Sequence, residues 1–177
     1  MKKALDINER LKKLVFAAMF AALTCVATMV IQIPSPMGGY VNLGDCFVLL
    51  CGILLGNAWG FIASGLGSML ADIITGYTYY APGTFIIKGM MALSVILIFR
   101  SMSKIFKRGI SYIVASTVAE IIMIMGYFGY ASLVLGKGIS AATSISGNIV
   151  QGVFGVISSY LLFSNFESRL SSGAWLK

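Results

Sequence analysis

Long apolar runs separated by short polar or Gly/Pro-rich segments set the pattern of this chain. Most runs approach the roughly 20 residues that an α-helix needs to cross a bilayer core of about 30 Å. They do not resemble the alternating segments of about 10 residues that build membrane β-barrels. The pattern predicts an all-α integral membrane protein, and we take residues 1–177 as a single domain. The six predicted transmembrane helices lie at about residues 14–33, 43–55, 59–75, 84–99, 110–135 and 139–163.

Composition agrees with a membrane protein, and the distribution of charge predicts its orientation. Hydrophobic residues make up 58% of the chain and charged residues 11%, against about 45–50% and about 25% in soluble domains. A net charge of +7 could indicate nucleic-acid binding. However, the basic residues gather before the first run, in one internal gap and after the last run, where the positive-inside rule places cytoplasmic segments. We therefore expect cytoplasmic N and C termini, a lipid environment and no nucleic-acid partner.

Catalytic and metal-binding motifs are missing from the sequence. Cys25, Cys46 and Cys51 have no paired spacing, and the chain has no histidine, which argues against a zinc site or a disulfide framework. The chain contains no nucleophile elbow, no zinc-protease motif and no P-loop. We expect no enzymatic activity, no metal and no cofactor, and the chain cannot drive transport by hydrolysing nucleotide itself.

Polar and aromatic residues concentrate in the loops that this topology places outside. Tyr40 and Asn42 lie in the loop at 34–42, and Tyr79 lies in the loop at 76–83. Lys88 follows about 6 Å below the outer surface, where it could bind a ligand, reach the interface or pair with Asp72. Asp45 is expected to cap the second helix rather than to contact a ligand.

Two further helices carry polar residues near the predicted midplane. Glu120 lies about 15 Å deep and shares a helical face with Tyr127, while Asn148 lies at a comparable depth on a stripe with Gln151. Such residues can hold helices together by hydrogen bonds. They can also form the floor of a site, which we favour because a planar polar ligand needs both hydrogen-bonding edges and a stacking face.

Small residues mark two close helix contacts. Ala17, Ala21, Ala18 and Ala22 form two overlapping small-xxx-small rows on the first helix, which suit either packing inside the bundle or docking of another protein. Gly52, Gly56 and Gly60 recur every fourth residue and predict that the second and third helices form a close-packed hairpin.

The order of several motifs resembles a known family. These motifs are the alanine rows, Gly39-Tyr40-Val41-Asn42-Leu43-Gly44-Asp45, Gly56-Asn57-Ala58-Trp59-Gly60 and Ala81-Pro82-Gly83-Thr84-Phe85-Ile86-Ile87-Lys88-Gly89. Together they resemble the S components of energy-coupling factor (ECF) vitamin transporters over essentially the whole chain. The resemblance implies a substrate-capture subunit of a prokaryotic cell membrane, which works with a transmembrane coupling subunit and two cytoplasmic ATPases.

The resemblance also implies roles for particular residues. Ala17, Ala18, Ala21 and Ala22 would meet the coupling subunit, and the loops around Tyr40 and Tyr79 would close over a vitamin. The implied substrate-binding set is Tyr40, Asn42, Tyr79, Lys88, Glu120, Tyr127, Asn148 and Gln151.

The identity of the ligand stays open between several vitamins. We favour hydroxymethylpyrimidine or a pyridoxine-like form of vitamin B6, because one Glu, one Lys and a pair of amides suit a compact heterocycle. Tryptophan would help to stack a larger flavin, but Trp59 and Trp175 map to the inner side. Riboflavin is the alternative. A proton-coupled secondary carrier using Glu120 and a structural subunit without a ligand are the competing classes.

Overall fold

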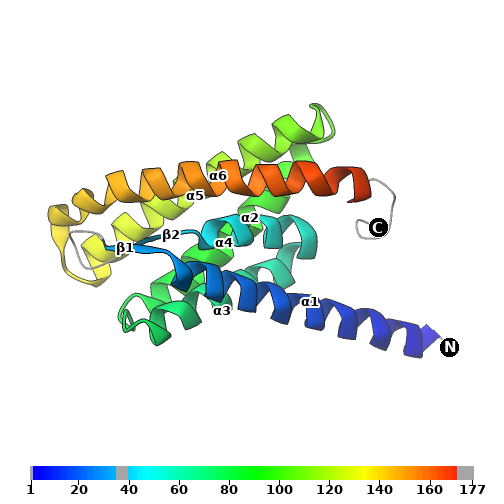
Figure 1. The fold of residues 1–177 in the computed structure, drawn as a ribbon, viewed down its shortest axis with the longest axis horizontal. Coiled ribbons are helices and arrows are strands. Elements are labelled where there is room, and N and C mark those ends of the chain that lie inside the picture. Colours follow the sequence, from blue (N-terminus) through cyan, green and yellow to red (C-terminus); the bar gives the residue numbers. More distant parts are fainter. Residues whose placement is uncertain (1, 35–39, 171–177) are drawn as a thin grey trace.

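A computed structural model describes residues 2–34 and 40–170. Its main elements are helices that run back and forth along one long axis (Figure 1). The α-helices are α1 (Lys2–Val30), α2 (Gly44–Leu55), α3 (Asn57–Ile74), α4 (Ala81–Met102), α5 (Arg108–Gly129) and α6 (Thr143–Leu170). The prediction of six helices is confirmed, and each predicted span overlaps one of them. Several of the helices extend further at one end than predicted.

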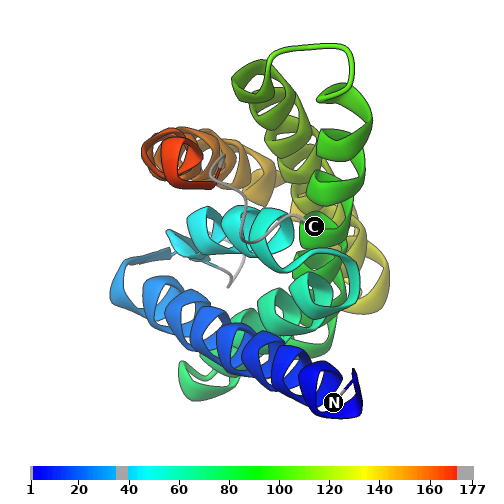
Figure 2. The ribbon, with the colours of Figure 1, turned by 90° about the vertical axis from the view of Figure 1, so that its right-hand side faces the viewer.

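The connections fall alternately at the two ends of the bundle, as the charge pattern predicts. The start of α1, the α2–α3 turn, the α4–α5 turn and the end of α6 lie at one end, and the remaining connections lie at the other (Figure 1). Four helical segments are long and apolar enough to cross a membrane, whereas 44–55 and 58–74 are shorter apolar helices. The short helix α2 lies in the middle of the bundle (Figure 2), in contact with α1, α3, α4 and α6.

Two parts of the backbone differ from the expectation. The first outside loop is framed by a short antiparallel hairpin of β1 (Gln32–Pro34) and β2 (Tyr40–Asn42), in which Ile33 pairs with Val41. The first helix begins well before the predicted start at about residue 14, because α1 is continuous from Lys2 onward. After α5 the chain passes through a wider π-helical segment, η1 (Tyr130–Val134), and a tighter 3-10 helix, η2 (Gly138–Ala142). Residues 35–39 of the predicted outside loop, and Trp175, lie outside the described residues.

Glycines allow the central helix to approach its neighbours closely. A Cβ on Gly60 would lie 3.2 Å from the Cα of Gly52, which confirms the predicted close hairpin of α2 and α3. A Cβ on Gly52 would lie only 2.4 Å from the carbonyl oxygen of Ala92 on α4. Nine of the residues of α2 are buried, so the first turn of this helix delivers its side chains into the centre of the molecule.

Candidate functional site

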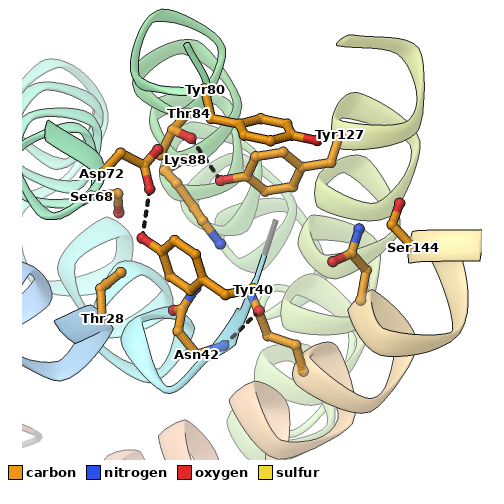
Figure 3. A pocket seen from close by; sticks show the side chains of 12 residues that line it. Thr28, Tyr40, Asn42, Ser68, Asp72, Tyr80, Thr84, Lys88, Tyr127 and Ser144 are labelled. Atoms are coloured by element: carbon orange, nitrogen blue, oxygen red, sulfur yellow. Dashed lines mark hydrogen bonds between the residues drawn. The ribbon is translucent and has the colours of Figure 1, made fainter. Parts of the chain in front are cut away.

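A polar cavity opens among the outer halves of the helices (Figure 3). Side chains from every α-helix except α2, from β2 and from the α3–α4 loop line it. They are Thr28, Tyr40, Asn42, Ser68, Asp72, Tyr80, Thr84, Lys88, Tyr127, Ser144, Asn148 and Gln151. Figure 3 shows Thr28, Ser68 and Asp72 on one side of the cavity and Ser144 on the other.

The floor of the cavity is a buried ion pair at the start of α2. Lys88 is 1% exposed and its Nζ donates to Asp45 Oδ1, while Asp45 itself is fully buried. Gln151 Nε2 donates to the other oxygen, Asp45 Oδ2, at 2.6 Å. A buried pair of charges is tolerated when the remaining hydrogen-bonding capacity is also satisfied, and Gln151 provides part of that here.

The expected role of Asp45 is wrong, and the structure also decides between the alternatives left open for Lys88. Asp45 does not cap α2, because the cap of the first turn comes from Asn42, whose Oδ1 accepts the backbone N–H of Gly44 at 2.8 Å. Lys88 pairs with Asp45 and not with Asp72. Lys88 does not reach the interface either, because its ammonium group lies in the interior.

Gln151 joins the hairpin to the ion pair. Its Oε1 accepts the backbone N–H of Asn42 at 2.8 Å, and its amide nitrogen is bonded to Asp45. Both ends of this side chain are therefore committed to the protein. Gln151 lines the cavity as predicted, but in this structure its hydrogen bonds brace β2 against α2 and α6.

Tyr40 closes the cavity from the hairpin. Its hydroxyl donates to Asp72 Oδ1 at 2.5 Å, and its ring lies 4.8 Å from that of Tyr77. Burial, and then the Asp72 carboxylate, raise the pKa of the Tyr40 hydroxyl above its ordinary value. The hydroxyl consequently stays protonated in the neutral range and keeps its hydrogen bond. We call this contact between Tyr40 and Asp72 the latch.

Tyrosines form a continuous aromatic wall above the ion pair. Tyr80 contacts the rings of Tyr79, Tyr127 and Tyr130, with centroids 5.0 to 6.3 Å apart. The hydroxyl of Tyr127 donates to Thr84 Oγ1 at 3.1 Å, and Lys88 Nζ lies 5.5 Å from the centre of the Tyr127 ring. The wall therefore offers aromatic faces to a flat ligand without any tryptophan.

The predicted site residues do not all reach the cavity. Six of them line it, namely Tyr40, Asn42, Lys88, Tyr127, Asn148 and Gln151. Tyr79 lies in the outer aromatic layer with 45% of its surface exposed. Glu120 is 4% exposed and lies behind the cavity, against Gly152 and Gly155 of α6. A direct contact of Tyr79 or Glu120 with a ligand stays a prediction.

Several lining residues were not selected from the sequence. Thr28, Ser68, Tyr80 and Thr84 line the cavity, yet a hydroxyl on an apolar helix is too common to be singled out. Ser144 shares a helical stripe with Asn148 and Gln151, and Asp72 was considered only as a partner of Lys88, so neither was assigned to the site. Ser68 continues the four-residue spacing of Gly52, Gly56 and Gly60. This spacing is the one sequence feature that could have indicated which face of α3 carries Ser68.

The alanine rows of α1 separate into an inner and an outer row. Ala17 is 6% exposed and packs with Cys51 and Ala63, and a Cβ on Gly67 would lie 2.4 Å from the carbonyl oxygen of Ala21. This row holds α1 against α3. Ala18 and Ala22 point away from the bundle and are exposed. Of the four residues predicted for partner docking, only these two lie on a free surface of the described chain.

A membrane bundle with a buried polar cavity beside an aromatic wall is the architecture of a membrane protein that binds a small molecule. Comparison with known proteins identifies the kind. Residues 8–168 match the family model described as "ECF-type riboflavin transporter, S component", and the chain belongs to this family. It is the substrate-binding S component of an ECF transporter, a multi-pass membrane protein and not an enzyme.

Individual relatives agree with the family assignment. An uncharacterised protein of Pyrococcus woesei is 34% identical over 137 residues, which is 75% of this chain and 86% of that protein. The solved S component of a bacterial ECF transporter superposes with a TM-score of 0.69 at 22% identity, covering 91% of this chain and 98% of the other. An S component for biotin superposes with a TM-score of 0.51 at 15% identity, covering 89% and 93%. At these identities the two structures show that the fold is shared.

Proposed function

We propose that this S component captures riboflavin from outside the cell for uptake by an ECF module. The observation that carries the proposal is the match of residues 8–168 to the riboflavin-type family. It favours the alternative ligand of the sequence analysis over hydroxymethylpyrimidine and pyridoxine-like compounds. The partners would be a transmembrane coupling subunit and two ATPase subunits, since the sequence contains no nucleotide-binding motif of its own.

The aromatic wall supports a flavin. One of the two arguments for a smaller ring was the distance of the tryptophans from the site. Tyr80 and Tyr127 line the cavity and supply stacking faces, which removes that argument. Offset stacking on aromatic side chains is a favourable arrangement for a planar heterocycle.

The two polar sides of the cavity suit the two halves of riboflavin. The hydroxyl and carboxyl groups of Thr28, Ser68 and Asp72 on one side match the hydroxyls of a ribityl chain. On the other side, the amide of Asn148 and the hydroxyl of Ser144 match the carbonyl and N–H groups along the pyrimidine edge of a flavin. Lys88 lies between them as a cationic donor.

Ligand-induced stabilisation of the purified chain in detergent tests this function without the partner subunits. Riboflavin at 100 times its Kd should stabilise the folded state by about 2.7 kcal/mol and raise the Tm. Thiamine, pyridoxine, hydroxymethylpyrimidine and biotin at the same concentration should leave the Tm unchanged. Asn148→Ala should weaken riboflavin binding, and Asn165→Ala, whose amide bonds the Leu161 carbonyl outside the cavity, is the matched control.

The outcomes separate the ligand from the family role. A Tm shift with pyridoxine or hydroxymethylpyrimidine, and none with riboflavin, would reject the flavin and keep the capture function. No shift with any vitamin would contradict binding by the isolated subunit.

A further inference from the structure

A second carboxyl group lies next to the ion pair and is not among the residues that line the cavity. Glu120 on α5 is 4% exposed, and both of its carboxylate oxygens are buried without a hydrogen-bond donor in the described chain. A buried polar group without a partner is costly, and a buried charge without one costs far more. Some feature of this position must compensate for that cost.

Glu120 and Asp45 occupy one niche against α6. The point at which a Cβ would stand on Gly155 lies 2.6 Å from Glu120 Oε1 and 3.0 Å from Asp45 Cβ. Gly152 provides a second gap, since a Cβ there would lie 3.1 Å from the Cβ of Glu120. Two glycines one turn apart therefore make room for two neighbouring acids. Ionised carboxylates only accept hydrogen bonds, so neither acid can satisfy the other unless one of them carries a proton.

The charges of the interior are out of balance. The buried charged side chains of the described residues are Asp45, Asp72, Lys88 and Glu120. Lys88 is the single cation among them and is bonded to Asp45. Asp72 accepts the Tyr40 hydroxyl beside the cavity. An ionised Glu120 would add a negative charge next to Asp45 with no cation left to compensate it.

Among the described residues, no other group around Glu120 can supply that compensation. Asp45 faces it from α2, Lys88 from α4 and Tyr112 from its own helix, and α6 presents Gly152 and Gly155. Lys88 is the one cation of this set and is already shared with Asp45.

We propose that Glu120 is a proton-binding site, in which a neutral carboxylic acid donates its hydrogen to Asp45. One proton then removes the charge of Glu120 and gives it a donor that Asp45 can accept, and the cluster of Lys88, Asp45 and Glu120 carries no net charge. The neutral acid leaves Lys88 bonded to a single carboxylate, which fixes its ammonium group in the floor of the cavity. The proton is bound in the ligand-free protein, so this site is independent of which vitamin the cavity takes.

Infrared spectroscopy of the ligand-free protein in lipid tests the proposal directly. The C=O stretch of a protonated carboxyl group absorbs at a higher frequency than the amide band. It is therefore separated from the bands of ionised carboxylates. Wild-type protein at neutral pH should show this band, and Glu120→Gln should remove a component of it. Ser116→Ala, one turn away and equally buried, should retain the whole band. Loss of the component in Asp72→Asn together with its retention in Glu120→Gln would overturn the proposal, as would absence of the band from the wild type.

A pH series of thermal unfolding provides a readout that does not depend on band assignment. Because the folded state needs the protonated form of Glu120, the Tm of the wild type should fall as the pH rises through the ionisation of this group. Glu120→Gln keeps a neutral hydrogen-bond donor, and its Tm should fall less over the same range. Equal pH dependence in the two proteins would contradict the proposal. Stabilisation of the wild type, but not of Glu120→Gln, by sodium ions at constant pH would show a metal cation in place of the proton.

Discussion

The ion pair between Lys88 and Asp45 is the residue-scale feature on which the cavity depends. It is buried on both sides, so its effect is asymmetric. Forming such a pair stabilises little, but removing one partner leaves an uncompensated charge. This asymmetry distinguishes a structural ion pair from a pair of independent ligand contacts.

Replacement of the lysine should therefore destabilise the protein strongly. Lys88→Met keeps the length of the side chain and removes its charge, which should lower the free energy of unfolding by about 3–5 kcal/mol. The double variant Lys88→Met/Asp45→Asn should recover a large part of that loss without recovering ligand binding. Thermal and denaturant unfolding in detergent measure the first effect, and ligand titration measures the second. A single variant as stable as the wild type would show that the charge is not buried in the way described.

At this scale the sequence predicts residue types better than pairings. Lys88, Glu120 and Asn148 stand out because ionisable and amide groups are rare at membrane depth. Their partners are set by the tertiary fold, since Asp45 lies 43 residues from Lys88 and 106 from Gln151. The local sequence around Asp45 favours a helix cap, and long-range pairing overrides that preference.

At the scale of elements, the central position of α2 depends on glycine. At Gly52 the helix lies directly against the backbone of α4. A larger side chain at this position would clash with backbone atoms, and a change of side-chain rotamer could not remove that clash. The same helix supplies Asp45 to the site. The distance between α2 and α4 consequently decides whether Lys88 can reach its partner.

A methyl group at this contact should disturb both the fold and the site. Gly52→Ala should destabilise the protein by about 1–3 kcal/mol, because Ala92 must move away, and it should weaken ligand binding as Asp45 shifts. Gly129→Ala is the matched control, since a Cβ there would meet nothing within 4 Å. Tm values of the two variants in detergent give the comparison, and an equal Tm for both would contradict the packing described.

The elements themselves are largely predictable from hydrophobic pattern, because each apolar run has to satisfy its backbone hydrogen bonds internally within a bilayer. The strands β1 and β2 escape such a prediction. They contain three residues each, which is too short for an alternating pattern, and Pro34 argues locally against a strand.

On the scale of the whole molecule, the two alanine rows of α1 should separate folding from assembly. The inner row, Ala17 and Ala21, packs against α2 and α3, whereas the outer row, Ala18 and Ala22, is exposed. The resemblance assigned all four residues to docking, and the structure leaves the outer row available for that proposed role. Sequence spacing alone could not distinguish the rows, because both have small-xxx-small periodicity.

Bulky substitutions in the two rows should consequently differ in effect. Ala22→Leu should leave vitamin binding by the isolated subunit unchanged and reduce uptake when the ECF module is present, because a close helix contact is lost. Ala17→Leu should lower the Tm of the isolated subunit. Vitamin binding, unfolding and uptake into cells or proteoliposomes are the three measurements. Normal uptake with Ala22→Leu would indicate that the coupling subunit docks elsewhere.

The latch between Tyr40 and Asp72 has a kinetic consequence. The volume open to a water molecule in the cavity is about 40 Å³, against about 300–1,000 Å³ for pockets that hold drug-sized ligands. We therefore expect the contact between Tyr40 and Asp72 to open before a vitamin can enter, so the observed association rate should level off at high ligand concentration, at the rate of opening. A hydrogen bond to a charged group contributes about 1.5–3 kcal/mol, and Tyr40→Phe should therefore raise this plateau about tenfold or more in stopped-flow experiments. Tyr160→Phe, far from the cavity, should leave this plateau unchanged.

The closed state also affects the equilibrium. The apparent affinity equals the intrinsic affinity multiplied by the fraction of molecules that are open, so a latch that slows entry also reduces equilibrium binding.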